Sequence, residues 1–346
     1  MLTRRTLFGA AASAAVAIAS PAVAQQKTLT INSFGGAYEQ THRKAVIDAF
    51  EKANNVKINV VTVYSADALA QLRAQKAAPQ FDVILFSGGQ EAVAAKEGLL
   101  DKMTLADLPD NGKSLYPFAT AGLARGEGPV MQVAAMGLIY QTDKVKPAPT
   151  SWKDVLDPKF KGHIVLTDFS NSYGLLSALM LNQALGGTLD NVDPGFKALE
   201  SIIKDSTVIS RSPDIQLNFA QNDAWLAPYA QDYAYALRKA GVPAKFVLPQ
   251  EGVAGSLITI NAVAGRPNRD LAMKFIDFSL RAEAQEMWAK DLRYSPVNKD
   301  LKLDPEIAGD VIYGEAAVNK LVVFDPIKIG EKRQSWVDRW NRMIGK

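Results

Sequence analysis

The chain has 346 residues, 48% of them hydrophobic, so it is long enough to bury a large core and to fold as two lobes. Its formal net charge at pH 7 is +3, and the first 24 residues contain two arginines and no acidic residue, so the rest of the chain is nearly neutral. Such a chain has no general attraction for nucleic acids or anionic membranes. The absence of cysteine excludes disulfides, thiolate metal sites, a cysteine nucleophile and a lipidated N-terminal cysteine.

The N-terminus has the pattern of an export signal. Two arginines precede an apolar run over 7–19, which is followed by Pro21 and the small-residue sequence AVA. The run is too short to span a hydrocarbon core of about 30 Å, so we expect a signal peptide over 1–24, cleaved near Ala24, and not an anchor. The paired arginines resemble a twin-arginine signal, but Sec signals can also carry two arginines, so both export routes stay open.

After residue 24, short β-rich runs alternate with amphipathic helical patterns. The expected strands are 29–31, 58–63, 82–86, 164–167, 207–210, 225–228, 246–248 and 257–261. The expected helices include 71–76, 90–97, 175–185, 215–221, 232–240, 269–280 and 282–292, with a C-terminal helix ending at Trp340. This alternation predicts an α/β protein with parallel sheets. No internal repeat or long linker occurs, which favours lobes that are interleaved along the chain.

Two predicted corners between a strand and a helix have the same composition. In each, an apolar strand is followed by a serine and two glycines, and a helix begins directly afterwards. Their residues are Ser33, Gly35, Gly36 and Tyr38 in SFGGAY, and Ser87, Gly88 and Gly89 in FSGGQE. In open α/β sheets, ligands bind beyond the carboxyl ends of strands, where glycine lets the backbone approach and helix N-termini offer free N–H groups. We therefore expect the two corners to share a ligand site, with tight turns alone as the alternative.

Three segments resemble one protein family. They are GLIYQTDKVKPAPTSWKDVLDPKFKGHIVLTD (137–168), ALRKAGVPAKFVLPQEG (236–252) and LRYSPVNKDL (292–301). The first resembles the crossing strand, Thr-Ser-Trp stretch and Lys-Gly turn of spermidine/putrescine-type solute-binding proteins. The other two resemble that family's Pro-x-Glu-Gly and Gly-Tyr-x-Pro-x-Asn elements. The motifs follow the family's order, and the resemblance covers essentially the whole chain after the export signal.

The resemblance implies a type II periplasmic binding protein, the substrate-binding subunit of an ABC importer. Such proteins have two α/β lobes joined by crossing strands, and they close on a small solute by hinge motion. Matching positions assign residues 27–135 and 254–297 to lobe 1, and residues 136–253 and 298–346 to lobe 2. The implied partners are a small-molecule ligand and permease subunits in the inner membrane. We expect a periplasmic monomer without enzymatic activity, cofactor, metal or nucleic acid.

The substrate-binding positions of the polyamine-binding relatives are not kept in this chain. By the resemblance, those proteins pair each ammonium with a carboxylate, and they have an aromatic residue and an Asp after Pro-x-Glu-Gly. Here Ser256 and Ile258 stand at about those positions, and the acidic pair of the second lobe is replaced within 170–173, which includes Ser170 and Ser172. We therefore expect a smaller, more polar solute, with putrescine or spermidine as the alternative.

Charged and aromatic candidates complete the expected site. Arg211, after a predicted strand, suits a carboxylate, and Asp232, in the first turn of a predicted helix, suits an ammonium. The alternatives are a solvated strand-end charge for Arg211 and a helix N-cap for Asp232. By the resemblance, Tyr38 matches a Tyr that follows the first corner in family members, Tyr294 matches a ligand-contacting Tyr, and Tyr229 lies about one residue from a stacking Trp; we expect all three in the site. These residues favour an amino acid or a γ-amino acid, or a simple carboxylic acid if Asp232 is only a cap.

Two other classes of function stay open. A ferric-iron binder of the same superfamily would need adjacent tyrosines with histidine or acidic help, and the sequence has no Tyr-Tyr pair. An exported enzyme on the same scaffold would need a nucleophile and a base, which the sequence does not place. We expect His42 on a solvated helix surface and His163 in a turn, and neither belongs to a ligand or nucleophile motif.

Overall fold

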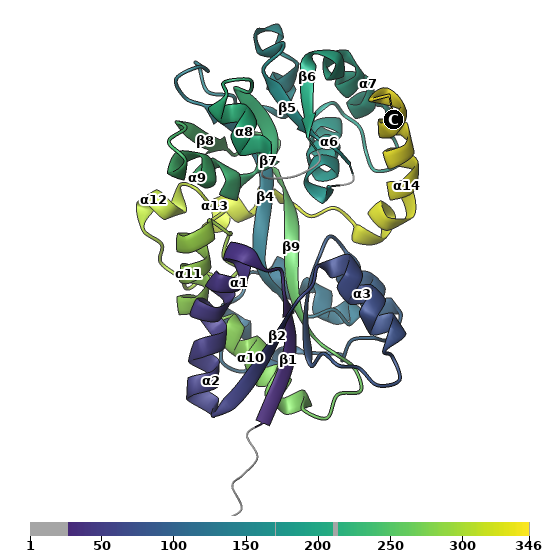
Figure 1. The fold of residues 1–346 in the computed structure, drawn as a ribbon, viewed down its shortest axis with the longest axis vertical. Helices are drawn as coiled ribbons and strands as arrows, with labels where there is room; N and C mark the ends of the chain where they lie inside the picture. The colour runs from purple at the N-terminus through teal and green to yellow at the C-terminus, as the bar shows by residue number, and fades with distance from the viewer. Residues whose placement is uncertain (1–26, 170, 210–213, 346) are drawn as a thin grey trace, which may run out of the picture.

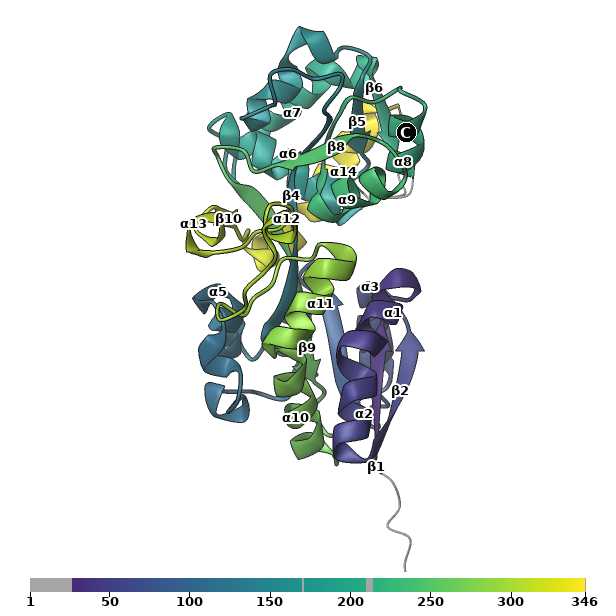
Figure 2. The ribbon, with the colours of Figure 1, turned by 90° about the vertical axis from the view of Figure 1, so that its left-hand side faces the viewer.

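A computed structural model describes residues 27–345 of the chain, except 170 and 210–213. The chain forms two lobes stacked along its long axis and joined by two long strands, β4 (Val130–Gln141) and β9 (Val253–Ala262) (Figure 1). In the side view of Figure 2, β4 again runs from one lobe into the other. The predicted α/β class and two-lobed architecture are confirmed. The predicted export signal lies outside the described residues.

Lobe 1 is built on β1 (Lys27–Ser33), which pairs in parallel with β2 (Val56–Thr62) and, at Ile31, with β3 (Val83–Ser87). Its helices are α1 (Gly36–His42), α2 (Asp48–Asn54), α3 (Ser65–Ala74), α4 (Gln90–Lys96), α5 (Pro117–Thr120), α10 (Arg269–Ser279) and α11 (Ala282–Leu292). A π-helical turn over Arg43–Ile47 joins α1 to α2. Figure 1 shows α1, α2 and α11 on one side of β1 and β2, with α3 on the other.

Lobe 2 is built on β5 (Ile164–Thr167), which pairs in parallel with β6 (Ser206–Ile209) and β7 (Leu226–Ala230), while β8 (Ala244–Val247) pairs antiparallel with β4. Its helices are α6 (Ser172–Ala184), α7 (Asp193–Ile202), α8 (Asp214–Ala220), α9 (Gln231–Lys239) and the C-terminal α14 (Pro326–Met343). Beside the crossing strands lie α12 (Pro305–Ala308), α13 (Glu315–Val318) and β10 (Leu321–Val322), which pairs with β9. No helix in the described part of the chain is long and apolar enough to cross a membrane.

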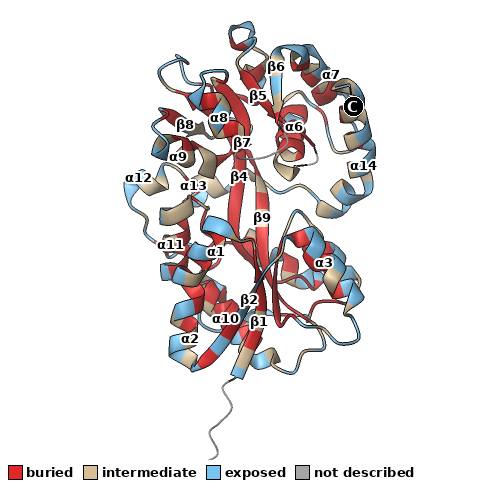
Figure 3. Cartoon of the chain, viewed as in Figure 1, coloured by how far each residue is buried: buried red, intermediate tan, exposed pale blue. Residues whose placement is uncertain are grey.

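The strands of both lobes belong to one hydrogen-bonded sheet with the order β2-β1-β3-β9-β4-β7-β5-β6. The strand β4 pairs antiparallel with β9 over 130–136 and with β7 over 136–140. All of its residues are buried, as the red strands in the middle of Figure 3 show. A strand buried on both faces reads as a continuous apolar run, which is the pattern of this segment. The parallel pairing that the sequence predicted is therefore interrupted by antiparallel strands at the crossing.

Two large hydrophobic clusters fill the lobes. One takes residues from Leu29–Val133 and Ile258–Val297, and the other takes residues from Ala134–Ala254 together with Trp336 and Trp340. We propose that the lobes divide as the sequence predicted, into 27–135 with 254–297 and 136–253 with 298–346. The change of cluster near residues 134 and 254–258 supports these boundaries.

Two motifs that are far apart in the sequence are hydrogen-bonded to each other. The Glu251 carboxylate accepts hydrogen bonds from the Ser151 hydroxyl and from the backbone N–H of Trp152. The Trp152 indole is fully buried and donates to the Gly252 carbonyl oxygen at 2.8 Å. The Thr-Ser-Trp and Pro-x-Glu-Gly elements therefore work as one structural unit of lobe 2, which explains why they occur together.

His42 is buried, so the prediction that it lies on a solvated surface is wrong. Its ring lies among Tyr38, Phe275 and Trp288, at centroid distances of 6.2, 6.3 and 5.8 Å. Neither ring nitrogen has a hydrogen-bond partner among the described residues. Burial, followed by the charge of Arg43, lowers the pKa of His42 to about 3. The charged neighbours in sequence misled the prediction, because the aromatic rings that cover His42 come from other parts of the chain, namely Phe275 of α10 and Trp288 of α11.

We expect His42→Phe to reduce the loss of stability at acid pH. In the unfolded chain a histidine titrates near pH 6.5, whereas His42 stays neutral in the folded protein down to about pH 3. The unfolded state therefore binds one more proton in this window, and His42 lowers the free energy of unfolding by about 1.4 kcal/mol for each pH unit below 6.5. Urea unfolding of both proteins at about pH 7.5 and about pH 5 measures the effect. The same loss in both proteins would show that His42 is not responsible.

Candidate functional site

A cleft of about 960 Å³ lies between the lobes. Its wall combines residues of both lobes and contains many of the residues that the sequence predicts for the site. Those in the wall are Tyr38, Ser87, Gly88, Gly89, Ser172, Asp232, Ser256 and Tyr294. The fold therefore brings together the second glycine corner, the starts of α6 and α9, and the crossing strand β9.

The corner after β3 needs glycine for two reasons. Gly88 and Gly89 have φ angles of 74° and 88°, in the left-handed region that favours glycine. Gly89 is also the N-cap of α4, and a Cβ atom there would lie 2.9 Å from the Cβ of Pro326 at the start of α14. The lobe 1 backbone at Gly88 and Gly89 is therefore not covered by side chains of its own, and it lies close to lobe 2 on the wall of the cleft.

The corner after β1 is placed differently from the prediction. Gly35 has a φ of 75°, and a Cβ atom there would lie 2.8 Å from a methyl carbon of β2, so this glycine permits a close strand contact. Gly36 is exposed, and the Ser33 side chain is buried at the end of β1. None of the three lines the cleft; the corner contributes the rings of Phe34 and Tyr38 instead.

Three further predicted residues do not appear in the described wall. Tyr229, on β7, is fully buried behind the cleft, where its ring packs edge-on against Tyr173 and Tyr233 at centroid distances of 5.5 and 4.9 Å. It therefore supports Tyr173 and Tyr233, two aromatic residues of the wall, from behind. Ser170 and Arg211 lie outside the described residues.

Asp232 is the one acidic side chain in the described wall of the cleft. It is the second residue of α9, and Ala230 holds the N-cap position, so the N-cap alternative does not apply. Its Oδ1 is buried without a hydrogen-bond partner among the described residues. Burial raises the pKa of Asp232 to about 7, against the opposing effect of nearby backbone N–H groups. A donor group in the cleft, above all an ammonium, would satisfy this carboxyl.

The first turn of α9 is held in place by its neighbour Gln231. The buried Gln231 amide donates to the Arg293 carbonyl oxygen at 2.6 Å and to the Ser295 hydroxyl oxygen at 2.7 Å. These two residues flank Tyr294, and Ser295 is itself paired with β4 through Val133. The hydrogen bonds therefore fix Asp232 of lobe 2 relative to Tyr294 beside the crossing strand.

Tyrosines that are scattered along the sequence meet in the cleft. Tyr38 and Tyr294 pack edge-on at 5.9 Å, and Tyr173 and Tyr233 also line the wall. Burial raises the pKa of Tyr38, Tyr173 and Tyr294 well above the usual value of 10, so these phenols stay protonated and are able to donate hydrogen bonds. The Tyr38 hydroxyl oxygen also accepts a hydrogen bond from the Gln132 side-chain amide. A ferric-iron site needs phenolates, which this burial disfavours. The described residues also contain no group of three or more His, Asp or Glu side chains that could hold a metal ion.

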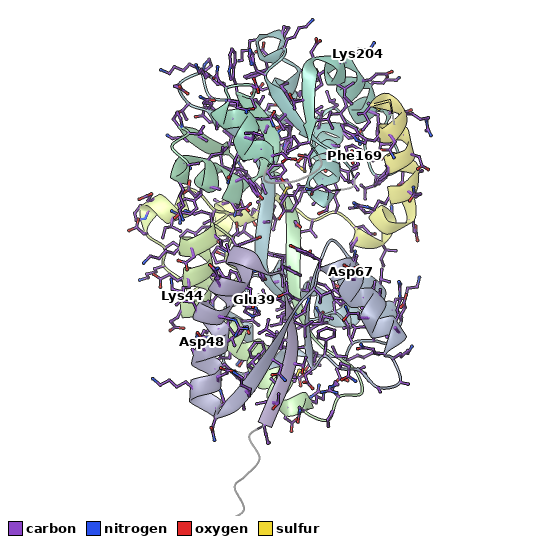
Figure 4. All side chains as sticks on the ribbon, viewed as in Figure 1. Glu39, Lys44, Asp48, Asp67, Phe169 and Lys204 are labelled. Carbon is purple, nitrogen blue, oxygen red and sulfur yellow. The ribbon has the colours of Figure 1, made fainter. Side chains whose placement is uncertain are left out.

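The basic side chains of the described wall are Arg73 and Arg333. Arg73 is engaged in a bidentate ion pair with Glu97, with N–O distances of 2.8 and 2.6 Å. Arg333, on α14, donates to the carbonyl oxygen of Phe169, which is labelled in Figure 4, and burial lowers the pKa of Arg333. A lowered pKa means that burial disfavours the charged guanidinium, and a bound carboxylate would favour it again.

Several residues that line the cleft were not predicted from the sequence. Tyr64 is 65% exposed and stacks on Phe34 with ring planes within 9° of parallel. Because Tyr64 follows the carboxyl end of β2, the rule that picked out the two glycine corners could have found it. Arg333 carries no such signal, since it lies within a helix and has no motif around it.

Comparison with known proteins identifies the family. A family model described as "Bacterial extracellular solute-binding protein" matches residues 45–314. The chain is 26% identical to a gamma-aminobutyric acid-binding protein of Pseudomonas aeruginosa over 86% of this chain and 83% of that protein. It is 25% identical to the spermidine/putrescine-binding periplasmic protein of Escherichia coli over 80% and 81% of the two chains.

Solved structures agree with this assignment. The crystal structure of an ABC transporter from Clostridium perfringens is similar with a TM-score of 0.80 and 25% identity, covering 91% of this chain and 99% of that one. The resemblance to solute-binding proteins that the sequence motifs indicated is confirmed. The chain belongs to the family of bacterial extracellular solute-binding proteins.

Proposed function

We propose that the protein is the solute-binding component of an ABC importer and that it captures a small zwitterion, an amino acid or a γ-amino acid, between its lobes. The ammonium of the solute would lie at Asp232 and its carboxylate at Arg333. The N–H groups of the Gly88-Gly89 corner and the phenols of the cleft would supply further donors. The lobes would close on the solute by motion about β4 and β9.

The charge of the cleft is the observation that carries this proposal. Asp232 is the one carboxyl of the described wall, which also carries two guanidinium groups: Arg73 is in an ion pair with Glu97, and Arg333 donates to the Phe169 carbonyl oxygen. A polyamine presents only cations, so it would need a carboxylate for each desolvated ammonium and would place its positive charges beside the Arg333 guanidinium. A zwitterion matches one carboxyl and one guanidinium group.

The ligands named for the relatives fit the proposal and its main alternative. The Pseudomonas aeruginosa relative is named for gamma-aminobutyric acid, which is a zwitterion of the proposed kind. The Escherichia coli relative is named for polyamines. At the positions where the sequence resemblance places polyamine-binding anions, this chain has Ser172 and Ile258 in the described wall, which favours the zwitterion.

The same proposal covers location and partners. The mature protein would work in the periplasm after removal of 1–24, as a monomer that docks on permease subunits in the inner membrane. It would perform no chemical step on its solute. The family and the named roles of the relatives support this part of the proposal.

We expect the mature protein to be stabilised by a small zwitterion. Thermal unfolding is measured with gamma-aminobutyrate, alanine, succinate, putrescine and spermidine, each added alone. A bound zwitterion with a dissociation constant on the order of micromolar should add about 2.7 kcal/mol to the free energy of unfolding at a hundredfold excess over that constant. Stabilisation by polyamines alone would contradict the proposed solute class, and turnover of a ligand would contradict a pure binding role.

We expect Asp232→Asn to stabilise the free protein while weakening binding. A carboxyl whose folded pKa is about 7 and whose unfolded pKa is near 3.9 lowers the free energy of unfolding as the pH rises from about 4 to 7. Above pH 7, the free energy of unfolding of the asparagine variant should therefore exceed that of the parent by up to about 4 kcal/mol, with no difference below about pH 4. Urea unfolding and calorimetric titration with gamma-aminobutyrate test both effects. Unchanged affinity would remove Asp232 from the ammonium site.

Arg333→Gln and Arg211→Gln distinguish two candidates for the carboxylate site. Loss of the guanidinium that pairs with a desolvated carboxylate should weaken gamma-aminobutyrate binding by about 30-fold or more. We expect this loss in Arg333→Gln, measured by calorimetric titration, with the fold checked by circular dichroism. The loss in Arg211→Gln alone would instead support the residue that the sequence singled out, which lies outside the described residues.

A further inference from the structure

A second hollow adjoins the cleft behind the Gly88-Gly89 corner. This chamber has a volume of about 210 Å³, and the residues that line both the chamber and the cleft include Gly88, Gly89, Ser172, Ser256, Pro326 and Arg333. Beyond this shared boundary, the chamber has its own wall from the start of α4, the segment 118–130 and the strand β9. The solute placement proposed above leaves the chamber unused.

Glu91 is the buried carboxyl of the chamber. It lies in the first turn of α4 and is only 5% exposed, and its Oε2 has no hydrogen-bond partner among the described residues. Burial, with the charge of Glu127, raises the pKa of Glu91 to about 7 against the opposing effects of nearby backbone N–H groups and of Arg125. A buried carboxyl oxygen without a partner disfavours the free protein unless a donor binds to it.

The other charges of the chamber are already matched to each other. The Arg125 Nε and Nη2 donate to the two carboxylate oxygens of Glu127 at 2.7 Å each, and Nη1 reaches the Ala121 carbonyl oxygen. This pair is neutral as a whole. At the boundary with the cleft, Arg333 is assigned to the carboxylate of the solute. When Glu91 is ionised, two carboxylates of the chamber, Glu91 and Glu127, share the one guanidinium of Arg125, and a cation at Glu91 would balance the remaining negative charge.

The size and lining of the chamber suit an aliphatic chain. Its volume exceeds the roughly 150 Å³ of an apolar cavity that holds benzene. Phe118, Leu175, Leu176 and Phe324 contribute apolar surface on the way to Glu91. At the boundary, no atom lies within 4 Å of the place where a Cβ atom of Gly88 would stand, which leaves room for a chain beside Gly88, whereas Gly89 packs against Pro326.

We propose that the chamber is a second compartment of the solute site, in which Glu91 binds a primary ammonium at the end of an aliphatic side chain of the solute. The preferred solute is then an amino acid with an amine in its side chain. This inference rests on the proposed function, which places the amino acid head group at Asp232 and Arg333. Asp232 and Glu91 would each receive one ammonium, and Arg333 the carboxylate.

Calorimetric titration with L-ornithine and L-norleucine tests the proposal, because the two differ only in a terminal ammonium against a methyl group. At about pH 8, where Glu91 is ionised, the parent protein should bind ornithine about tenfold or more tightly than norleucine. In Glu91→Gln, this preference should fall to about onefold with norleucine affinity unchanged. Glu286→Gln, which removes an exposed carboxylate of α11, should keep the preference of the parent.

The outcomes separate the chamber from the proposed function. Two results would overturn the chamber assignment and leave the zwitterion site standing, provided that gamma-aminobutyrate binds. In the first, ornithine binds no more tightly than norleucine. In the second, Glu91→Gln weakens the binding of ornithine and of norleucine equally. If no amino acid binds, the proposed function fails, and the chamber is tested with propylammonium chloride against sodium chloride at equal ionic strength. A higher unfolding temperature in the parent but not in Glu91→Gln supports the chamber, and no difference between the proteins overturns it.

Discussion

The pairing of β4 with β9 is the interaction on which both lobes and the cleft depend. The strand β4 is hydrogen-bonded to β9 in lobe 1 and to β7 and β8 in lobe 2, and all of its residues are buried. Its backbone polar groups are away from water and must be paired within the sheet, so the strand cannot be moved without disturbing both lobes. The lobes therefore face each other across a common sheet. The Gly88-Gly89 corner and the first turn of α9 are brought to opposite sides of the cleft in this way.

The cleft and the adjoining chamber each contain a buried carboxyl that does not stabilise the free protein. Asp232 and Glu91 are carboxyls with a buried, unpartnered oxygen, and the pKa of each is raised to about 7. Each lowers the stability of the free protein as it ionises, and each offers a place for a donor on a solute. His42 is the opposite case, a buried base that is kept neutral among aromatic rings and serves packing. Burial alone does not mark a binding residue; an adjoining hollow is also needed.

Much of the fold and part of the candidate site could be predicted from local patterns. The strand end at Ser87, the left-handed glycines that follow it and the position of Asp232 in the first turn of a helix all have signals within a few residues. Residues whose burial depends on distant partners could not be placed in this way. Gly35 packs against β2, and Tyr229 lies behind other tyrosines. These positions differ from the prediction because the sequence does not state which strand or ring will cover a residue.

The sequence by itself determined the alternation of strands and helices, the two-lobed family and the positions of the glycine corners, because these features depend on local periodicity, on the backbone freedom of glycine and on ordered motifs. Only the tertiary structure decided which side chains share a wall. Arg333 comes from the C-terminal helix, and the tyrosines of the cleft come from five separate segments. The chamber at Glu91 exists only because a lobe 1 helix, a crossing strand and the start of α14 meet around it. Contacts between segments hundreds of residues apart follow from the packing of the whole chain, which no local pattern encodes.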